Sequence, residues 1–144
     1  MVIGSDYGTE ILSGVNDQLN TMNLKLVAYT KHKMSDTSFV TPITKLKKAN
    51  CDFIVLGSNI RDTILPMATA RKMGWNVDFM GVSTSGTAAT ITHGKGAVEG
   101  LYVSTGFEVM YEDEATDPRA VAFFKNYKEK FIKKDVPVKE TAYV

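Results

Sequence analysis

The apolar residues of this chain follow two alternating patterns, short continuous runs and longer segments with helical spacing. The run at residues 2–4 predicts a short strand. Over residues 11–22 the apolar positions recur at helical intervals, which predicts an amphipathic helix that Asn23 ends. The next apolar run, residues 24–29, predicts a second strand.

A second helix is expected after a polar turn. Ser35 and Asp36 are candidates for its N-cap, because a short side chain with an oxygen acceptor satisfies a free N–H group at a helix start. Phe39, Ile43 and Leu46 recur at helical spacing and predict its apolar face.

Residues 53–56 are continuously apolar and predict a strand buried on both faces, as in a parallel sheet covered by helices. Residues 60–73 return to helical spacing, and Gly74 suits the left-handed position that follows a helix. A fourth strand is expected at residues 77–81. A segment of small residues, 83–89, comes after it.

Residues 101–103 predict a fifth strand. Thr116 or Asp117 is expected to cap a final helix with Pro118 in its first position, where the missing N–H of proline is not needed. The last residues, 140–144, resemble the beginning of a further helix.

Strands that alternate with helices predict an α/β fold with right-handed crossovers. The simplest arrangement is a three-layer sandwich around a parallel five-stranded sheet in the flavodoxin-like order 2-1-3-4-5. Ligands bind such sheets beyond the carboxyl ends of the strands, near the point where the strand order reverses. This rule selects residues 5–8 after the first strand, Ser58 and Asn59 after the third, and residues 83–85 after the fourth.

Composition narrows the class of function. The chain has 144 residues, of which 44% are hydrophobic and 23% charged, and its net charge is +1. This balance gives no electrostatic reason to expect binding to nucleic acid or to an anionic membrane. No apolar stretch has the roughly 20 residues that a membrane span needs. Residues 1–4 lack the pattern of a signal peptide, and the single Cys51 cannot form an internal disulfide.

Catalytic and metal sites find little support in the sequence. His32 and His93 are expected in loops, and with Cys51 they form no cluster at ligand spacing. Residues 81–85 faintly resemble a nucleophile elbow, but Ser85 replaces its second glycine and His93 is the only nearby base. The acidic residues 112–114 are expected in a solvated loop. We therefore expect no enzymatic activity, no cofactor and no metal.

Tyr7 is the residue at the predicted ligand edge whose chemistry suits binding. It combines a flat apolar ring with a hydroxyl group, and Gly8 beside it allows close approach. From its position alone, packing over the helix start is an equally good interpretation.

Taken together, the motifs resemble the type I periplasmic binding proteins, and in particular the branched-chain amino-acid (Leu/Ile/Val) receptors of ABC importers. The resemblance covers nearly the whole chain, and its strength lies in the order and spacing of the motifs. In chain order they are Asp6 to Gly8, residues 36–39, residues 43–49, Cys51 to Gly57, residues 70–74, residues 79–81, residues 97–102, Asp117 and Pro118, Phe124, Tyr127 and Phe131, and Ala142 and Tyr143.

The resemblance implies a periplasmic or extracellular receptor whose two lobes close on a small molecule and deliver it to the membrane subunits of an importer. Residues 1–104 would be the second ligand-binding lobe. Residues 105–144 would be a hinge crossover, with the hinge near Thr105 and Gly106, and a partial return into the first lobe. The family's first half, with its signal sequence, would then be absent from this fragment.

The resemblance also places ligand contacts. Tyr7 matches a tyrosine after the first strand, Asn59 or Ile60 matches the position after the third strand, and an acid that pairs with the ligand ammonium falls near Ser83. The expected binding set is Tyr7, Ser58, Asn59, Ile60, Ser83 and Thr84.

With Ser83 in place of an acid, we expect a ligand other than an ordinary α-amino acid, such as an aromatic or other carboxylate, or an amide. Two other classes stay open, a cytoplasmic ligand-sensing regulator of the same fold and a small flavodoxin-like enzyme. The isolated lobe is also expected to form homodimers through exposed aromatic residues, namely Phe123, Phe124 and Phe131.

Overall fold

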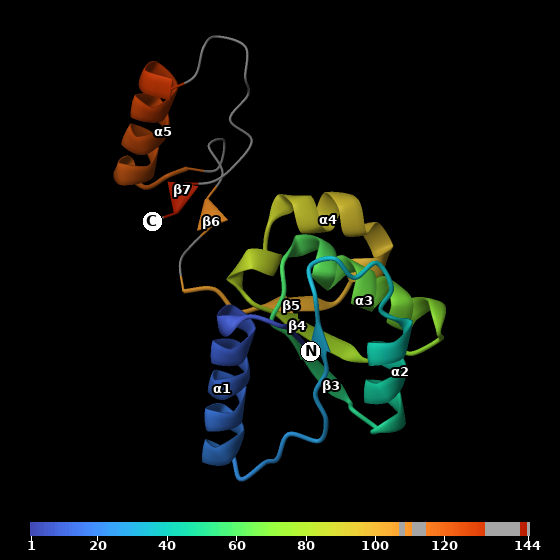
Figure 1. Ribbon diagram of the computed structural model, residues 1–144. Helices are drawn as coiled ribbons and strands as arrows, with labels where there is room; N and C mark the ends of the chain where they lie inside the picture. Colours follow the sequence, from blue (N-terminus) through green and yellow to red (C-terminus); the bar gives the residue numbers. More distant parts are fainter. Residues whose placement is uncertain (107–108, 111–114, 132–141, 144) are drawn as a thin grey trace. The chain divides into compact units, whose positions relative to one another are not determined.

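The computed structural model describes residues 1–106, 109–110, 115–131 and 142–143 (Figure 1). The chain divides into two compact units, Met1–Ser104 and Thr105–Val144. The first unit alternates strands with helices. The described residues of the second form one helix and a short pair of strands.

Helices and strands of the first unit follow the predicted alternation. In chain order they are β1 (Val2–Ile3), α1 (Asp6–Thr21), β2 (Lys31–His32), α2 (Val40–Lys48), β3 (Phe53–Leu56), α3 (Ile60–Lys72), β4 (Asp78–Gly81), the 3-10 turn η1 (Ser83–Ser85), α4 (Ala88–Gly94), the 3-10 turn η2 (Lys95–Val98) and β5 (Leu101–Val103).

All strand pairs of this unit are parallel. β1 pairs with β2, and β3, β4 and β5 form a second group. The two groups meet where Val2 bridges Gly57. There the Ile3 N–H donates to the Gly57 carbonyl at 3.0 Å, and the Gly57 N–H donates to the Met1 carbonyl at 2.9 Å. The strand order is therefore 2-1-3-4-5, and the predicted α/β fold is confirmed.

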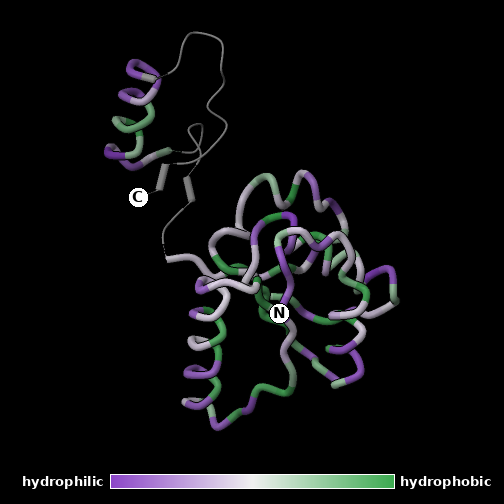
Figure 2. Tube along the Cα trace, in the orientation of Figure 1, coloured by the Kyte–Doolittle hydropathy of each residue, from purple (hydrophilic) through white to green (hydrophobic). Residues whose placement is uncertain are grey.

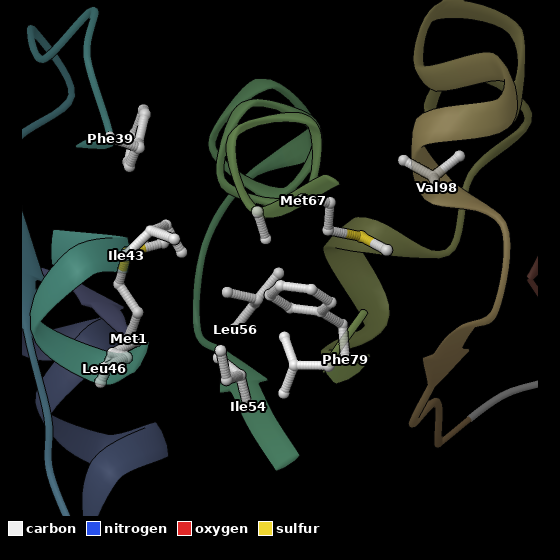
Figure 3. Packing of buried hydrophobic residues seen from close by; sticks show 11 residues of the cluster. Met1, Phe39, Ile43, Leu46, Ile54, Leu56, Met67, Phe79 and Val98 are labelled. Carbon is white, nitrogen blue, oxygen red and sulfur yellow. The ribbon is translucent and has the colours of Figure 1, made fainter. Parts of the chain in front are cut away.

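The main hydrophobic core lies between the sheet and the helices α2 and α3. Ile54 and Leu56 of β3 and Phe79 of β4 are buried there with Met67 of α3. Met67 lies over the side chains of Leu56 and Phe79 (Figure 3). Burying a side chain of this size contributes about 1.5–3 kcal/mol, so this layer fixes the carboxyl ends of the strands in place.

β3 is buried mainly on one face. Ile54 and Leu56 point into the core, whereas Phe53 is 48% exposed and Val55 is half-buried. Successive side chains of a strand point to opposite faces, so Phe53 and Val55 face away from α2 and α3. The prediction that both faces of this strand are buried is therefore wrong for the face that carries Phe53 and Val55.

β2 lies later in the chain than the sequence pattern indicated. Residues 24–29, predicted to be a strand, have no regular structure, and the strand is Lys31–His32. The reason is register, because β1 pairs Val2 with Lys31 and Ile3 with His32. The preceding segment contains hydrophobic residues (Figure 2), and Leu24, Val27 and Tyr29 are all exposed.

The predicted caps of α2 are also wrong. The helix begins at Val40, with Phe39 as its N-cap and no side-chain capping bond. Asp36 instead accepts a hydrogen bond from the Lys33 N–H at 2.9 Å, which closes a local turn. Phe39 is fully buried, so packing of its ring determines where the helix starts.

Three helices end with the same backbone motif. Asn23, Asn50 and Gly74 follow α1, α2 and α3 with positive φ angles of 55°, 57° and 64°. After α3, the Gly74 N–H donates to the Arg71 carbonyl and the Trp75 N–H to the Ala70 carbonyl, which is the Schellman pattern. The predicted helix ends at Asn23 and Gly74 are confirmed.

The second unit contains α5 (Pro118–Phe131) and the antiparallel strands β6 (Val109–Met110) and β7 (Ala142–Tyr143). Pro118 is the first helical residue, as predicted. The Arg119 N–H donates to Asp117 Oδ1 at 2.7 Å, so Asp117 acts as the cap. Hydrogen bonds from Arg119 also lower the pKa of the Asp117 carboxyl.

Two expectations for this unit need correction. The predicted helix at residues 140–144 is wrong at Ala142 and Tyr143, which form β7, and its other residues lie outside the described part of the chain. Phe124, expected to be exposed, is buried against Ala120. Phe123 is exposed and stacks on Tyr127, whereas the side chain of Phe131 and the acidic residues 112–114 lie outside the description.

None of the helices within the described ranges is long and apolar enough to cross a membrane.

Replacement of Gly8 by alanine tests the contact between α1 and β1. A Cβ atom at Gly8 would lie 1.9 Å from the Ile3 carbonyl oxygen, whereas one at Gly14 of the same helix would meet nothing within 4 Å. We expect Gly8→Ala to lower the free energy of unfolding by roughly 1–3 kcal/mol. The control Gly14→Ala should raise it by roughly 0.5–1 kcal/mol. Urea denaturation measures both, and equal effects of the two substitutions would contradict the packing.

Candidate functional site

Three turns at the carboxyl ends of β1, β3 and β4 are joined by hydrogen bonds. The hydroxyl of Tyr7 lies 3.1 Å from Thr84 Oγ1, although the two residues are 77 positions apart. Thr84 Oγ1 donates to the backbone carbonyl of Ser58 at 3.0 Å. We call these three residues, Tyr7, Ser58 and Thr84, the rim.

Local structure presents Tyr7 at the surface. Ser5 is the N-cap of α1, and its hydroxyl accepts a hydrogen bond from the Gly8 N–H at 3.4 Å. Tyr7 therefore lies in the first turn of α1, directly beyond β1, and is 38% exposed. Its ring and hydroxyl are accessible to a ligand at the edge where the strand-order rule places one.

A second set of hydroxyl groups contacts the rim on its buried side. Thr63 Oγ1 and Ser85 Oγ lie 2.8 Å apart, and Ser85 Oγ contacts the Ser58 carbonyl at 3.4 Å. Thr63, Ser85 and Ser58 are all fully buried. Buried hydroxyl groups need hydrogen-bond partners, so this cluster holds the turns after β3 and β4 in one arrangement.

The side chain of Ser58 is fixed from the other side by His32. His32 Nε2 lies 2.8 Å from Ser58 Oγ, and its Nδ1 lies 3.7 Å from Asp62 Oδ2. Arg61 contacts Asp62 Oδ1 through Nε at 2.7 Å and also binds the Met34 carbonyl. The buried carboxylate of Asp62 thus has an arginine partner, as a buried charge requires.

The sequence-based placement of both histidines is wrong. His32 belongs to β2, is buried, and packs edge-on against Phe39 with ring centroids 5.3 Å apart. His93 lies in the last turn of α4 and is exposed. Lys31 and Lys33, which flank His32, are exposed. Only its pairing with β1 turns it inward.

Ser58, His32 and Asp62 are the residue types of a hydrolase triad, but only Ser58 and His32 are within hydrogen-bond distance, and His32 Nδ1 contacts the Lys33 carbonyl at 3.3 Å. The serine is also fully buried, so a substrate carbonyl does not reach its oxygen in this structure. In the elbow-like segment, Ser85 is buried against Thr63. The arrangement thus fixes the turn after β3 and presents no accessible nucleophile.

The other predicted binding residues lie on the same turns. Asn59 is exposed and is the N-cap of α3, without a side-chain capping bond. Ile60, the first residue of α3, is half-buried, as is Ser83 at the start of η1. Among the predicted set, hydrogen bonds join Tyr7, Ser58 and Thr84. Sequence analysis did not identify Thr63 or Asp62, and it placed His32 in a loop. The strand-order rule selected Ser85, but the expected binding set did not include it.

Neither a metal-binding cluster nor an activated thiol is present among the described residues. Across the residues that the structure describes, no group of three His, Cys, Asp or Glu side chains is placed to hold a metal ion. Burial is the main cause that raises the pKa of the Cys51 thiol, which disfavours the reactive thiolate.

A curated protein is similar to part of this chain. The leucine-specific-binding protein of Salmonella typhimurium is 29% identical over 98 residues, which are 68% of this chain and 27% of that protein. The chain therefore spans 27% of the length of this curated relative.

Solved structures share the fold. An extracellular ligand-binding receptor from Rhodopseudomonas palustris superposes with a TM-score of 0.73 at 25% identity, over 97% of this chain and 40% of that one. A fatty acid ABC transporter substrate-binding protein from Thermomonospora curvata has a TM-score of 0.75 at 21% identity, over 90% of this chain and 33% of that one.

A family model described as periplasmic binding protein matches residues 2–143. Because this match runs across nearly the whole chain, the chain belongs to the periplasmic binding protein family.

Proposed function

We propose that this chain is a ligand-binding lobe of an extracellular or periplasmic receptor that serves an ABC importer. The observation that carries the proposal is the hydrogen-bonded rim at the carboxyl ends of three strands, in a chain of the periplasmic binding protein family. The rim exposes Tyr7 and lies on a buried, hydrogen-bonded base. A receptor that holds a ligand without transforming it needs these features and no nucleophile.

In this proposal, residues 1–104 are the second lobe, and residues 105–144 are a hinge crossover and a partial return into the first lobe. The ligand lies in the cleft between lobes and is released to the membrane subunits of the importer. Closure about a hinge near Thr105 and Gly106 would then cover the rim. Tyr7, Asn59 and Ser83 face the ligand.

Ser83 determines the class of ligand in this proposal. The resemblance to branched-chain amino-acid receptors places an acid for the ligand ammonium at this position. A serine there removes a charge-assisted hydrogen bond, which is worth roughly 1.5–3 kcal/mol. The favoured ligands are therefore small polar metabolites without an α-ammonium group, such as an aromatic or other carboxylate, or an amide.

Replacement of Tyr7 by alanine tests the rim as a binding surface. In the full-length protein, Tyr7→Ala should weaken ligand binding by roughly tenfold or more, because it removes an aromatic contact and a hydroxyl. Tyr29→Ala is the matched control, since Tyr29 is an exposed tyrosine that precedes β2 at the amino ends of the strands. Isothermal titration calorimetry gives both affinities. Equal affinities would exclude Tyr7 from the site.

Calorimetry with amino acids tests the ligand class. We expect the full-length protein to bind leucine and valine at least about tenfold more weakly than amides or acids of the same carbon skeleton, since Ser83 carries no charge for the ammonium. Ser83→Glu should reverse this preference, and Ser83→Gln is the uncharged control. Tight leucine or valine binding by the unsubstituted protein would refute the proposed ligand class.

A further inference from the structure

We propose that the Tyr7 hydroxyl meets the ligand as a hydrogen-bond acceptor, so that the site selects ligands with an N–H or O–H donor at the position facing Tyr7. The inference rests on the proposed function and narrows its ligand class. It follows from the direction of the hydrogen bonds in the rim, whose protons can be assigned one after another.

The assignment begins at the carbonyl of Ser58. A carbonyl oxygen only accepts hydrogen bonds, so the 3.0 Å contact from Thr84 Oγ1 requires the threonine to donate. A hydroxyl carries one proton. Once Thr84 has donated it to Ser58, its oxygen has only lone pairs for any other partner.

Tyr7 is that other partner. Its hydroxyl lies 3.1 Å from Thr84 Oγ1, and because the threonine proton is already used, Tyr7 must donate. The phenol oxygen then has no proton left and keeps its remaining acceptor capacity. Since Tyr7 is 38% exposed, a ligand that reaches this oxygen meets an acceptor.

Buried contacts fix this direction. The Ser58 carbonyl belongs to a fully buried residue, whose side chain lies 2.8 Å from His32 Nε2. A second relay, from Thr63 through Ser85, reaches the same carbonyl, with contacts of 2.8 and 3.4 Å. Reversing Tyr7 would require Thr84 to abandon its carbonyl partner.

The consequence is a preference within the proposed ligand class. An amide or a hydroxyl can donate to Tyr7 while the relay stays intact. A carboxylate has no proton to donate, so its oxygen would face the acceptor oxygen of Tyr7. It would bind there only after the hydrogen bond between Tyr7 and Thr84 breaks. We expect a discrimination of about tenfold, comparable to the net effect of one hydrogen bond.

Infrared spectroscopy tests the direction without any ligand. The C–O stretching frequency of a phenol differs between a hydroxyl that donates and one that accepts, and subtraction of the Tyr7→Phe spectrum isolates Tyr7 in ring-labelled protein. This chain should show the donor signature. Thr84→Val should change it, because valine cannot accept, while Thr84→Ser should retain it. An acceptor signature, or no change in Thr84→Val, would overturn the inference.

Binding of a matched ligand pair tests the consequence in the full-length protein. 4-Methylpentanamide and 4-methylpentanoate share one skeleton, and only the amide donates. The unsubstituted protein should bind the amide about tenfold more tightly. Thr84→Val should narrow this ratio and Thr84→Ser should preserve it. Equal or tighter binding of the acid by the unsubstituted protein would refute the preference.

The experiments distinguish failure of the proposed function from failure of this inference. A donor signature for Tyr7 in a protein whose ligand affinity is unaffected by Tyr7→Ala would overturn the proposed function of the rim. An acceptor signature in a protein that loses affinity with Tyr7→Ala would overturn the inference alone.

Discussion

The five parallel strands of the first unit depend on a narrow connection between β1 and the end of β3, at Gly57. Its backbone exchanges two hydrogen bonds with Met1 and Ile3, and this links the pair β1 and β2 to the group of β3, β4 and β5. A Cβ atom at Gly57 would lie 3.0 Å from side-chain carbons of both Val2 and Ile11. The next residue along the chain is Ser58. The connection that completes the sheet therefore also brings the end of β1, with Tyr7, beside the turns that carry Ser58 and Thr84.

Local chemistry was sufficient to predict most of the architecture. Continuous apolar runs located β3 and β5, and helical spacing located α1 and α3, because a core face imposes those periods on the sequence. Asn23 and Gly74 marked helix ends because few residues adopt a positive φ. The strand-order rule then selected the turns that hold Tyr7, Ser58 and Thr84. Their role in binding stays a prediction, whereas their hydrogen bonding is a property of the structure.

What sequence analysis missed depends on distant partners. β2 consists of Lys31 and His32 because β1 pairs with them, and the more apolar residues 24–29 before them pair with no strand in the described structure. His32 becomes buried through that pairing and meets Ser58, which is 26 positions away. Asp62, in the first turn of α3, is buried, although an acidic residue in the first turn of a helix is common at the surface. No periodicity or local propensity indicates a contact between residues so far apart, so this buried polar network could be found only in three dimensions.

The exposed segment at residues 24–29 has a consequence for the behaviour of the protein in solution. It precedes the edge strand β2, and an unpaired strand edge beside exposed apolar side chains is a template for pairing with another chain. Lys25, Lys31 and Lys33 interrupt this edge and are exposed. Like charges on two such edges repel each other, which opposes edge-to-edge aggregation. This protection is electrostatic, so it weakens as ionic strength rises. Concentrated salt therefore weakens the repulsion that opposes association along this edge.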